Sequence, residues 1–212
     1  MGFYERRILP KLLDRMMSDE ETVRLRKAAL APARGRVLEV GFGTGLNVPH
    51  YPSAVTHLVG VDPNPGMEKL ARERLGTAPM KGEFTLGRGD DGLPYEDGTF
   101  DTVVTTLVLC TVTDVGRALS EIRRVLRSGG QYLMLEHGLS PDAAVQQWQR
   151  RLNGFNRTVF GGCNLNRPIS NLVTGAGFAF QTLSEFYRKG APKFAAWTTS
   201  GIAMGRYRPM RV

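Results

Sequence analysis

Cysteine, long apolar runs and, toward the carboxyl end, acidic residues are scarce in this sequence of 212 residues. Its two cysteines, Cys110 and Cys163, form no C-x-x-C pair, so we expect free thiols and no metal site. The longest apolar run, around residues 103–112, contains threonines and is far shorter than the roughly 20 residues that span a bilayer. The first residues also lack the apolar core of a secretory signal. These absences favour a cytoplasmic protein without a membrane-spanning helix.

Charge is unevenly distributed along the chain. Residues 145–212 contain ten basic residues and one acidic residue, whereas residues 37–144 contain nine basic and 14 acidic residues. Residues 1–36 have a net charge of +4, and the whole chain has a net charge of +8. The basic ends would attract an anionic surface such as phospholipid headgroups, or they form a solvated face. No aromatic residues alternate with these basic residues as they do in base-stacking surfaces, so no nucleic-acid partner is expected.

The sequence shows no internal repeat and no linker, and its length fits one domain over residues 1–212. After residue 36, apolar runs alternate with helical patterns, which predicts an α/β fold with a mainly parallel sheet. We expect strands at 37–40, 56–61, 84–86, 100–109, 131–136, 178–187 and 203–208. We expect helices at 8–17, 20–30, 66–75, 117–126, 141–160 and 169–176. The pair Gly129-Gly130 suits the end of the fourth of these helices.

A glycine-rich stretch, VLEVGFGTGLN, includes and follows the first expected strand. Gly41, Gly43 and Gly45 stand at every second position, and glycines let a backbone turn tightly and approach a bound molecule. The dinucleotide fingerprint G-x-G-x-x-G places its third glycine one residue later, so the spacing argues against a nicotinamide site. Glu39, and Asp62 after the next strand, would suit the hydroxyl groups of a ribose, because a carboxylate can accept two hydrogens.

Four successive stretches resemble motifs of class I S-adenosylmethionine-dependent methyltransferases: VLEVGFGTG, GVDPNPGM, LPYEDGTFDTVV and RVLRSGGQYLMLEHG. The resemblance implies S-adenosylmethionine as cofactor and a Rossmann-like, seven-stranded, mainly parallel sheet with helices on both faces. It also implies that the glycine loop passes beneath the methionine part and that Asp62 contacts the ribose. Asp90 or Asp91 would face the adenine, and Leu107 belongs with the cofactor-binding residues. On this basis residues 1–34 are a helical lid, 35–140 the cofactor-binding core and 141–212 the substrate side.

The methyl acceptor is expected above the carboxyl ends of the fourth and fifth strands, where crevices open in such sheets. The residues there are mostly apolar, which favours a small lipophilic acceptor. His137 is the candidate catalytic base, because an imidazole can take a proton at neutral pH, or it is hydrogen-bonded and fixes its loop. Cys110 is expected to line the pocket rather than to act as a nucleophile.

A narrower resemblance extends over most of residues 37–178. The stretches TLVLCTVTD, LEHG and GGCNLNRPI resemble those of alkyl thiol S-methyltransferases and their bacterial relatives. This resemblance favours a thiol as acceptor, with Asn164 and Arg167 orienting it or closing the pocket. Alternatively, Asn164 caps the next helix.

Other interpretations stay open at this stage. The enzyme could instead be a phospholipid N-methyltransferase or a quinone C-methyltransferase, and less favoured are a nicotinamide-dependent oxidoreductase and an RNA-binding module. Residues 8–17 form an amphipathic helix that either covers the domain as a lid or makes peripheral contact with a membrane.

Overall fold

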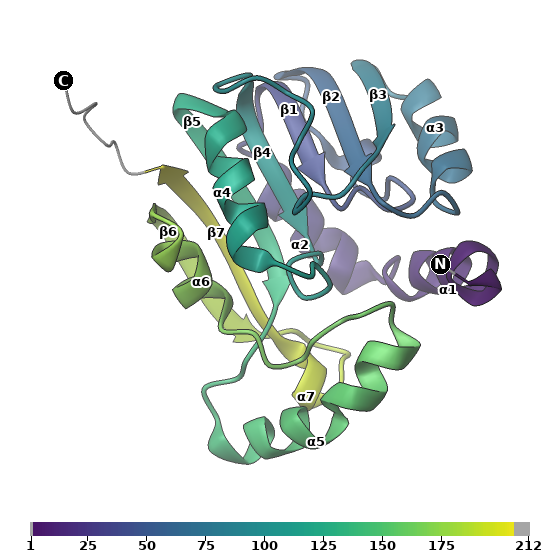
Figure 1. Ribbon diagram of the computed structural model, residues 1–212, viewed down its shortest axis with the longest axis vertical. Helices are drawn as coiled ribbons and strands as arrows, with labels where there is room; N and C mark the ends of the chain where they lie inside the picture. The colour runs from purple at the N-terminus through teal and green to yellow at the C-terminus, as the bar shows by residue number, and fades with distance from the viewer. Residues whose placement is uncertain (1, 206–212) are drawn as a thin grey trace.

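The structure is a computed structural model that describes residues 2–205. Its centre is a seven-stranded sheet in the order β3-β2-β1-β4-β5-β7-β6 (Figure 1). The first five strands are parallel, whereas β7 runs antiparallel to both β5 and β6. This arrangement confirms the predicted Rossmann-like fold with seven strands, and β6 and β7 form an antiparallel pair at one edge of the sheet.

The elements follow the predicted alternation. The strands are β1 Gly35–Val40, β2 Val55–Asp62, β3 Lys81–Leu86, β4 Phe100–Thr106, β5 Leu126–His137, β6 Phe178–Tyr187 and β7 Trp197–Gly205. The α-helices are α1 Leu9–Met16, α2 Glu20–Leu30, α3 Glu68–Gly76, α4 Val115–Val125, α5 Ala143–Val159, α6 Ile169–Gly175 and α7 Lys193–Ala196. A π-helical turn, η1 Tyr4–Ile8, precedes α1, and a 3-10 turn, η2 Val48–His50, follows the glycine loop.

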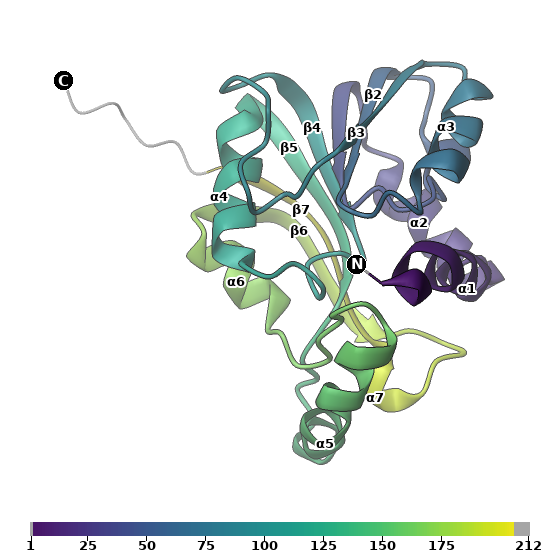
Figure 2. The same ribbon diagram turned by 45° about the vertical axis from the view of Figure 1, so that its right-hand side comes forward.

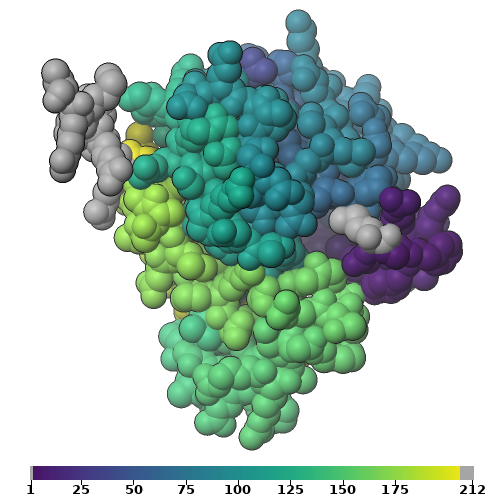
Figure 3. Space-filling view, in the orientation of Figure 1, coloured from purple at the N-terminus to yellow at the C-terminus, as the bar shows by residue number. Residues whose placement is uncertain are grey.

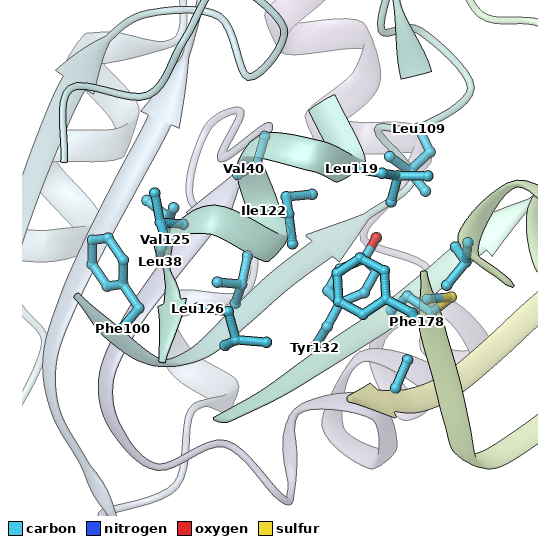
Figure 4. Packing of buried hydrophobic residues seen from close by; sticks show 14 of the residues in the cluster. Leu38, Val40, Phe100, Leu109, Leu119, Ile122, Val125, Leu126, Tyr132 and Phe178 are labelled. Atoms are coloured by element: carbon cyan, nitrogen blue, oxygen red, sulfur yellow. The ribbon is translucent and has the colours of Figure 1, made fainter. Parts of the chain in front are cut away.

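The sheet is covered by helices on both faces because its strands alternate apolar side chains between them. On one face, α4 and α6 pack against residues such as Leu38, Phe100 and Tyr132, which are labelled in Figure 4. On the other face, α2 and α3 pack around Val37 and Leu133 together with their strand neighbours. Burial on both faces orders the strands and so fixes their carboxyl ends, where the loops of the candidate site begin.

Several boundaries differ from the prediction. β4 ends at Thr106 rather than at residue 109, because Leu107 has a φ of 56° and leaves the extended conformation. Gly129 and Gly130 lie within β5 and not at a helix end, since the sheet extends β5 back to Leu126. β7 begins at Trp197, six residues before the predicted start, and the last predicted residues, 206–208, lie outside the described range.

The N-terminal helices, η1 and α1, lie beside the carboxyl ends of the strands (Figure 2). In the space-filling view this segment lies next to the end of α5 (Figure 3). There the Tyr4 hydroxyl donates a hydrogen bond of 2.9 Å to the Val159 carbonyl. The N-terminal helix expected from the sequence is therefore present, and its role as a lid stays a prediction. Among the described residues, no helix combines the length and apolar character needed to cross a membrane.

Candidate active site

The glycine loop turns the chain away from the sheet directly after β1. Gly41, Gly43 and Gly45 all have positive φ angles, of 74°, 57° and 82°, a conformation that favours glycine. The loop is anchored to the neighbouring strand by two bonds to the Val61 carbonyl, from the N–H groups of Gly41 and Phe42. Glycine is therefore favoured at each of the three positions for conformational reasons.

The surroundings of these glycines differ in a way that indicates a binding surface. A Cβ atom at Gly41 would lie 2.0 Å from the side chain of Val108, so this glycine permits close packing of two loops. A Cβ at Gly43 would have no described atom within 4 Å. Gly43 thus exposes bare backbone to open space, as a loop that approaches a ligand would.

Asp62 joins the end of β2 to this loop. Its carboxylate accepts hydrogen bonds from the backbone N–H of Gly43, at 2.9 Å, and from that of Asn64, at 2.8 Å. The side chain is 8% exposed, and burial raises its pKa although the two N–H donors act in the opposite direction. Each carboxylate oxygen can accept a further bond, so the group can hold the loop and still bind hydroxyl groups of a ligand.

Glu39 lies in the buried layer beneath the loop. Its two carboxylate oxygens accept hydrogen bonds from Asn47 Nδ2, at 2.8 Å, and from the Tyr51 hydroxyl, at 2.7 Å. Arg26 donates to Asn47 Oδ1 at 2.8 Å, which extends the network to α2. Burial raises the pKa of Glu39 to about 7. Glu39 therefore fixes the segment after the glycines. The sequence of the first strand did not indicate that Asn47, Tyr51 and Arg26 belong to this network.

The two aspartates expected near the adenine have different environments. Asp90 is buried and accepts two bonds from Arg88 and one from the Asp114 N–H, at 3.0 Å. These bonds, above all those from Arg88, lower its pKa against the effect of burial. The side chain of Asp91 is 68% exposed and pairs with Arg88 at 3.3 Å. The structure brings Asp90 onto the start of α4 and leaves Asp91 at the surface.

The N-terminal helices are attached to the glycine loop through Asp14. This carboxylate accepts bonds from the Thr44 hydroxyl, at 2.5 Å, and from both terminal nitrogens of Arg74, at 2.8 and 3.1 Å. Arg74 also donates to the Thr44 carbonyl at 2.7 Å. Sequence patterns gave no signal for this contact, because its three residues are far apart in the chain.

The same helices lie over the segment that follows Asp62. Asn64 Nδ2 donates to the Glu5 carbonyl at 2.8 Å, and a Cβ at Gly66 would lie 2.2 Å from the Arg6 carbonyl. The N-terminal helices thus cover the residues next to the predicted ribose site.

The expected acceptor side begins where β4 ends. Leu107 is the only non-glycine residue among residues 2–205 with a positive φ, and such a conformation costs about 1–2 kcal/mol. Its turn lets the buried Glu136 accept bonds from the N–H groups of Val108, at 3.3 Å, and Leu109, at 3.1 Å. Burial raises the pKa of Glu136 to about 7. A strained turn of this kind is typical of functional sites.

His137, Cys110 and Cys163 come together beside this turn. His137 Nε2 lies 3.0 Å from Cys163 Sγ, which lies 3.5 Å from Cys110 Sγ. The contact with the Cys110 thiol lowers the pKa of Cys163, and His137 acts in the same direction. Burial lowers the pKa of His137, but its hydrogen bond to Cys163 and the negative charges of Cys163 and Glu136 together outweigh burial and raise it. Both thiols are free, and within residues 2–205 the buried Nδ1 of His137 has no hydrogen-bond partner.

Asn164 and Arg167 join the two cysteine segments. The side chain of Asn164 donates to the Cys110 carbonyl, at 2.9 Å, as does its backbone N–H. Arg167 donates to the Leu109 carbonyl. Asn164 therefore makes loop contacts rather than capping α6, whose N-cap is Pro168 without a side-chain cap. The structure brings His137, Cys110, Asn164 and Arg167 into one cluster, as a common pocket requires.

The strand order, the glycine loop after β1 and the carboxylate after β2 together form the architecture of a class I methyltransferase. A family model described as a methyltransferase domain matches residues 38–134. The chain belongs to the S-adenosylmethionine-dependent methyltransferases. This membership confirms the predicted cofactor, S-adenosylmethionine, and the exposed backbone at Gly43 and the carboxylate of Asp62 fit a ligand with a ribose.

Relatives with known names include two human proteins. The chain is 32% identical to thiol S-methyltransferase TMT1B over 92% of this chain and 79% of that protein. It is 36% identical to thiol S-methyltransferase TMT1A over 68% of this chain, and there it spans only 59% of the relative's length. It is also 36% identical to a phosphatidylethanolamine N-methyltransferase of Cereibacter sphaeroides, over 66% of this chain and 69% of that protein.

A solved structure supports the fold. A S-adenosylmethionine-dependent methyltransferase from Thermotoga maritima superposes with a TM-score of 0.68 at 20% identity, over 96% of this chain and 98% of that chain. The similarity extends over the whole sheet and is not restricted to the cofactor half.

Proposed function

We propose that this chain transfers the methyl group of S-adenosylmethionine to the sulfur of a small lipophilic thiol. The observation that carries the proposal is the extent of its similarity to TMT1B, which spans 199 residues. The methyltransferase domain model ends at residue 134, so the similarity continues into the segments that surround the expected acceptor.

S-adenosylmethionine, when bound, supplies a methyl group on a positively charged sulfur. Gly43 and Asp62 are the residues that would hold it, the first through its bare backbone and the second through its free lone pairs. Transfer then requires that the acceptor sulfur be held in line and that water be excluded. The buried Leu109 and Cys110 and the partly buried Val108 provide a mostly apolar wall for this purpose.

A thiol acceptor needs little help to react. A free thiol has a pKa of about 8.5, so a few per cent is thiolate at neutral pH. We assign to His137 the role of promoting deprotonation of the acceptor thiol, because it lies at the end of β5 next to the cysteine pair. The side chains of Asn164 and Arg167 hold the segment that closes this side.

A panel of acceptors tests the proposal. Purified protein is incubated with S-adenosylmethionine and with an alkyl thiol, a phosphatidylethanolamine or a quinol, and products are analysed by mass spectrometry. We expect methylated thiol as the main product. Methylation of the phospholipid amine alone would contradict the proposal and favour the activity after which the Cereibacter relative is named. Methylation of the quinol alone would likewise contradict it.

We also propose that the protein works in the cytoplasm and touches a membrane surface through its N-terminal helices. Phe3, Ile8 and Met16 are exposed to 75%, 47% and 43%, and the exposed Arg6 and Arg7 are close to them in the chain. Apolar and basic side chains together favour an anionic interface. The test is co-sedimentation with vesicles of phosphatidylcholine with or without phosphatidylserine. Binding that is equal for wild type and for the double variant Phe3→Ser, Ile8→Ser would contradict this contact.

A further inference from the structure

We propose that Cys110, His137 and Cys163 form a site for a divalent cation of the zinc class, with one coordination position open for the sulfur of the acceptor. The role of the open position rests on the proposed thiol methylation, whereas metal binding itself does not. The sequence gave no indication of such a site, because its three residues lie 26 or more positions apart. Only the fold brings them together.

The ligand atoms lie close enough together to bind one cation. All three lie within 4.8 Å of one another, so each edge is within about 1.3 Å of its tetrahedral value. Zinc binds sulfur at about 2.3 Å and histidine nitrogen at about 2.0–2.1 Å, so tetrahedral geometry requires separations of about 3.8 Å between two sulfurs and about 3.5 Å between sulfur and nitrogen. The observed values are 3.5 Å between the sulfurs and 3.0 Å from Cys163 Sγ to His137 Nε2. Shifts of about 0.5 Å or less would adjust these two edges.

A disulfide fits this geometry less well. The two sulfurs would have to approach from 3.5 Å to about 2.05 Å, a movement several times larger than metal binding requires of the same pair. A disulfide would also leave His137 without a role. Two cysteines and one histidine are a donor set found in catalytic zinc sites, which keep a fourth position open.

Hydrogen bonds hold the two cysteine segments in place. Asn164 binds the Cys110 carbonyl through its backbone N–H and its side chain, each at 2.9 Å. Asn156 Nδ2 donates to the Cys163 carbonyl at 2.8 Å. Because the backbone around both thiols is fixed, the ligands are pre-arranged and little order has to be created when a cation binds.

The charges around the cluster suit a cation. A metal would bind the two sulfurs as thiolates, and two negative charges in a largely buried place require compensating positive charge. Arg167 interacts electrostatically with both cysteines and supplies one positive charge, while the buried carboxyl of Glu136 lies on the same side. A divalent cation supplies the remainder.

The location connects the site to methyl transfer. Val108, which packs on Gly41 of the cofactor loop, lies two residues before Cys110. Cys110 is buried, but His137 and Cys163 are partly exposed, so the open position faces away from the core. The acceptor thiol would release its proton to water as its sulfur binds the metal. The sulfur then forms the bond to the methyl carbon while the sulfonium bond breaks, which leaves a thioether and S-adenosylhomocysteine. In this arrangement His137 promotes loss of the thiol proton as a ligand of the metal, and the role of a base predicted from the sequence is not needed.

Cobalt binding tests the site without any turnover. Metal-free protein, kept reduced with a phosphine, is titrated with Co²⁺ and the thiolate-to-cobalt absorption is recorded. We expect saturation at one Co²⁺ per chain and displacement by Zn²⁺. The variants Cys163→Ser and His137→Gln should each bind Co²⁺ at least about tenfold more weakly. His57→Gln is the matched control, because His57 lies near the start of β2, away from the cluster, with its Nε2 2.8 Å from a carboxylate oxygen of Glu83.

Two results would overturn the proposal: no thiolate-to-cobalt absorption, or the same affinity in Cys163→Ser and wild type. Circular dichroism of each variant checks that weaker binding is not a loss of folding. Should Cys163→Ser fail to fold, the same titration of His137→Gln against His57→Gln decides the question.

The role of the open position is tested with the cobalt-loaded protein. Addition of an alkyl thiol should change the charge-transfer absorption, whereas the corresponding thioether should not. Undiminished thiol methylation by metal-free protein would remove the metal from the reaction but leave the proposed function intact. Co²⁺ binding at the cluster without methylation of any thiol would do the reverse.

Discussion

The carboxylate of Asp62 lies 2.9 Å from the backbone nitrogen of Gly43, so the acid that closes β2 holds the glycine loop that follows β1. The pairing of Val40 with Val61 in adjacent parallel strands places the two elements side by side. One side chain therefore both shapes the loop and presents its remaining lone pairs to a ligand.

Replacement of Asp62 by asparagine should weaken binding of S-adenosylmethionine at least tenfold, which corresponds to about 1.4 kcal/mol. The amide puts a donor opposite one of two backbone N–H groups, so the loop loses one anchor and the ribose loses an acceptor. Isothermal titration calorimetry measures the affinity. The control is Asp97→Asn, at a side chain that is 82% exposed. Equal affinities for wild type and Asp62→Asn would contradict the assignment.

Two glycine substitutions should separate binding from folding. Gly43→Ala adds a methyl group that meets no described atom, so we expect a loss of stability of only about 1 kcal/mol from its φ, but a strong loss of cofactor binding. Gly41→Ala places a methyl group 2.0 Å from Val108 and should cost about 2 kcal/mol or more. Chemical denaturation and calorimetry give both quantities. Full cofactor affinity in Gly43→Ala would show that no ligand approaches there.

Release of the N-terminal helices should be measurable by hydrogen exchange. Asp14→Asn weakens the bonds to Arg74 and Thr44, so amide exchange in residues 4–16 should accelerate while β1 and β4 stay protected. Glu68→Gln removes an exposed ion pair with Arg72 and serves as the control. If both variants exchange alike, the Asp14 contact does not fasten these helices.

Stability should depend on pH through Glu39. Its pKa is about 7 in the folded chain against 4.5 for an ordinary glutamate, so the folded state retains a proton that the unfolded state loses. The free energy of unfolding therefore falls as the pH rises from about 4.5 to 7, by about 3 kcal/mol from this group. The melting temperature of Glu39→Gln should therefore rise relative to that of wild type as the pH increases over that range. A constant difference would show that Glu39 keeps an ordinary pKa.

Local patterns were sufficient for much of the fold. The helix predicted at residues 20–30 and the strand at 178–187 match α2 and β6, because periodicity and end signals of these segments agree with their final environment. The predicted end of β4 and the predicted start of β5 were wrong, because pairing within the sheet sets them. Leu107 is an apolar residue that continues the strand pattern, yet its backbone turns. Gly129 lies within a strand, although glycine is more typical of a helix end.

The site divides in the same way. The cofactor half could be read from the sequence because its glycines and Asp62 need only two neighbouring strands to meet. The acceptor half depends on loops that join distant segments, such as the contact between His137 and Cys163. The tie between Asp14 and Arg74 is of this long-range kind as well, and local spacing carries no information about it.

The first helical turns of the chain touch Asn64 on one side and Val159 on the other. An outward movement of residues 2–16 would therefore uncover the segment after Asp62 and the end of α5 together. In the proposed reaction, product release and acceptor entry would then depend on the same movement.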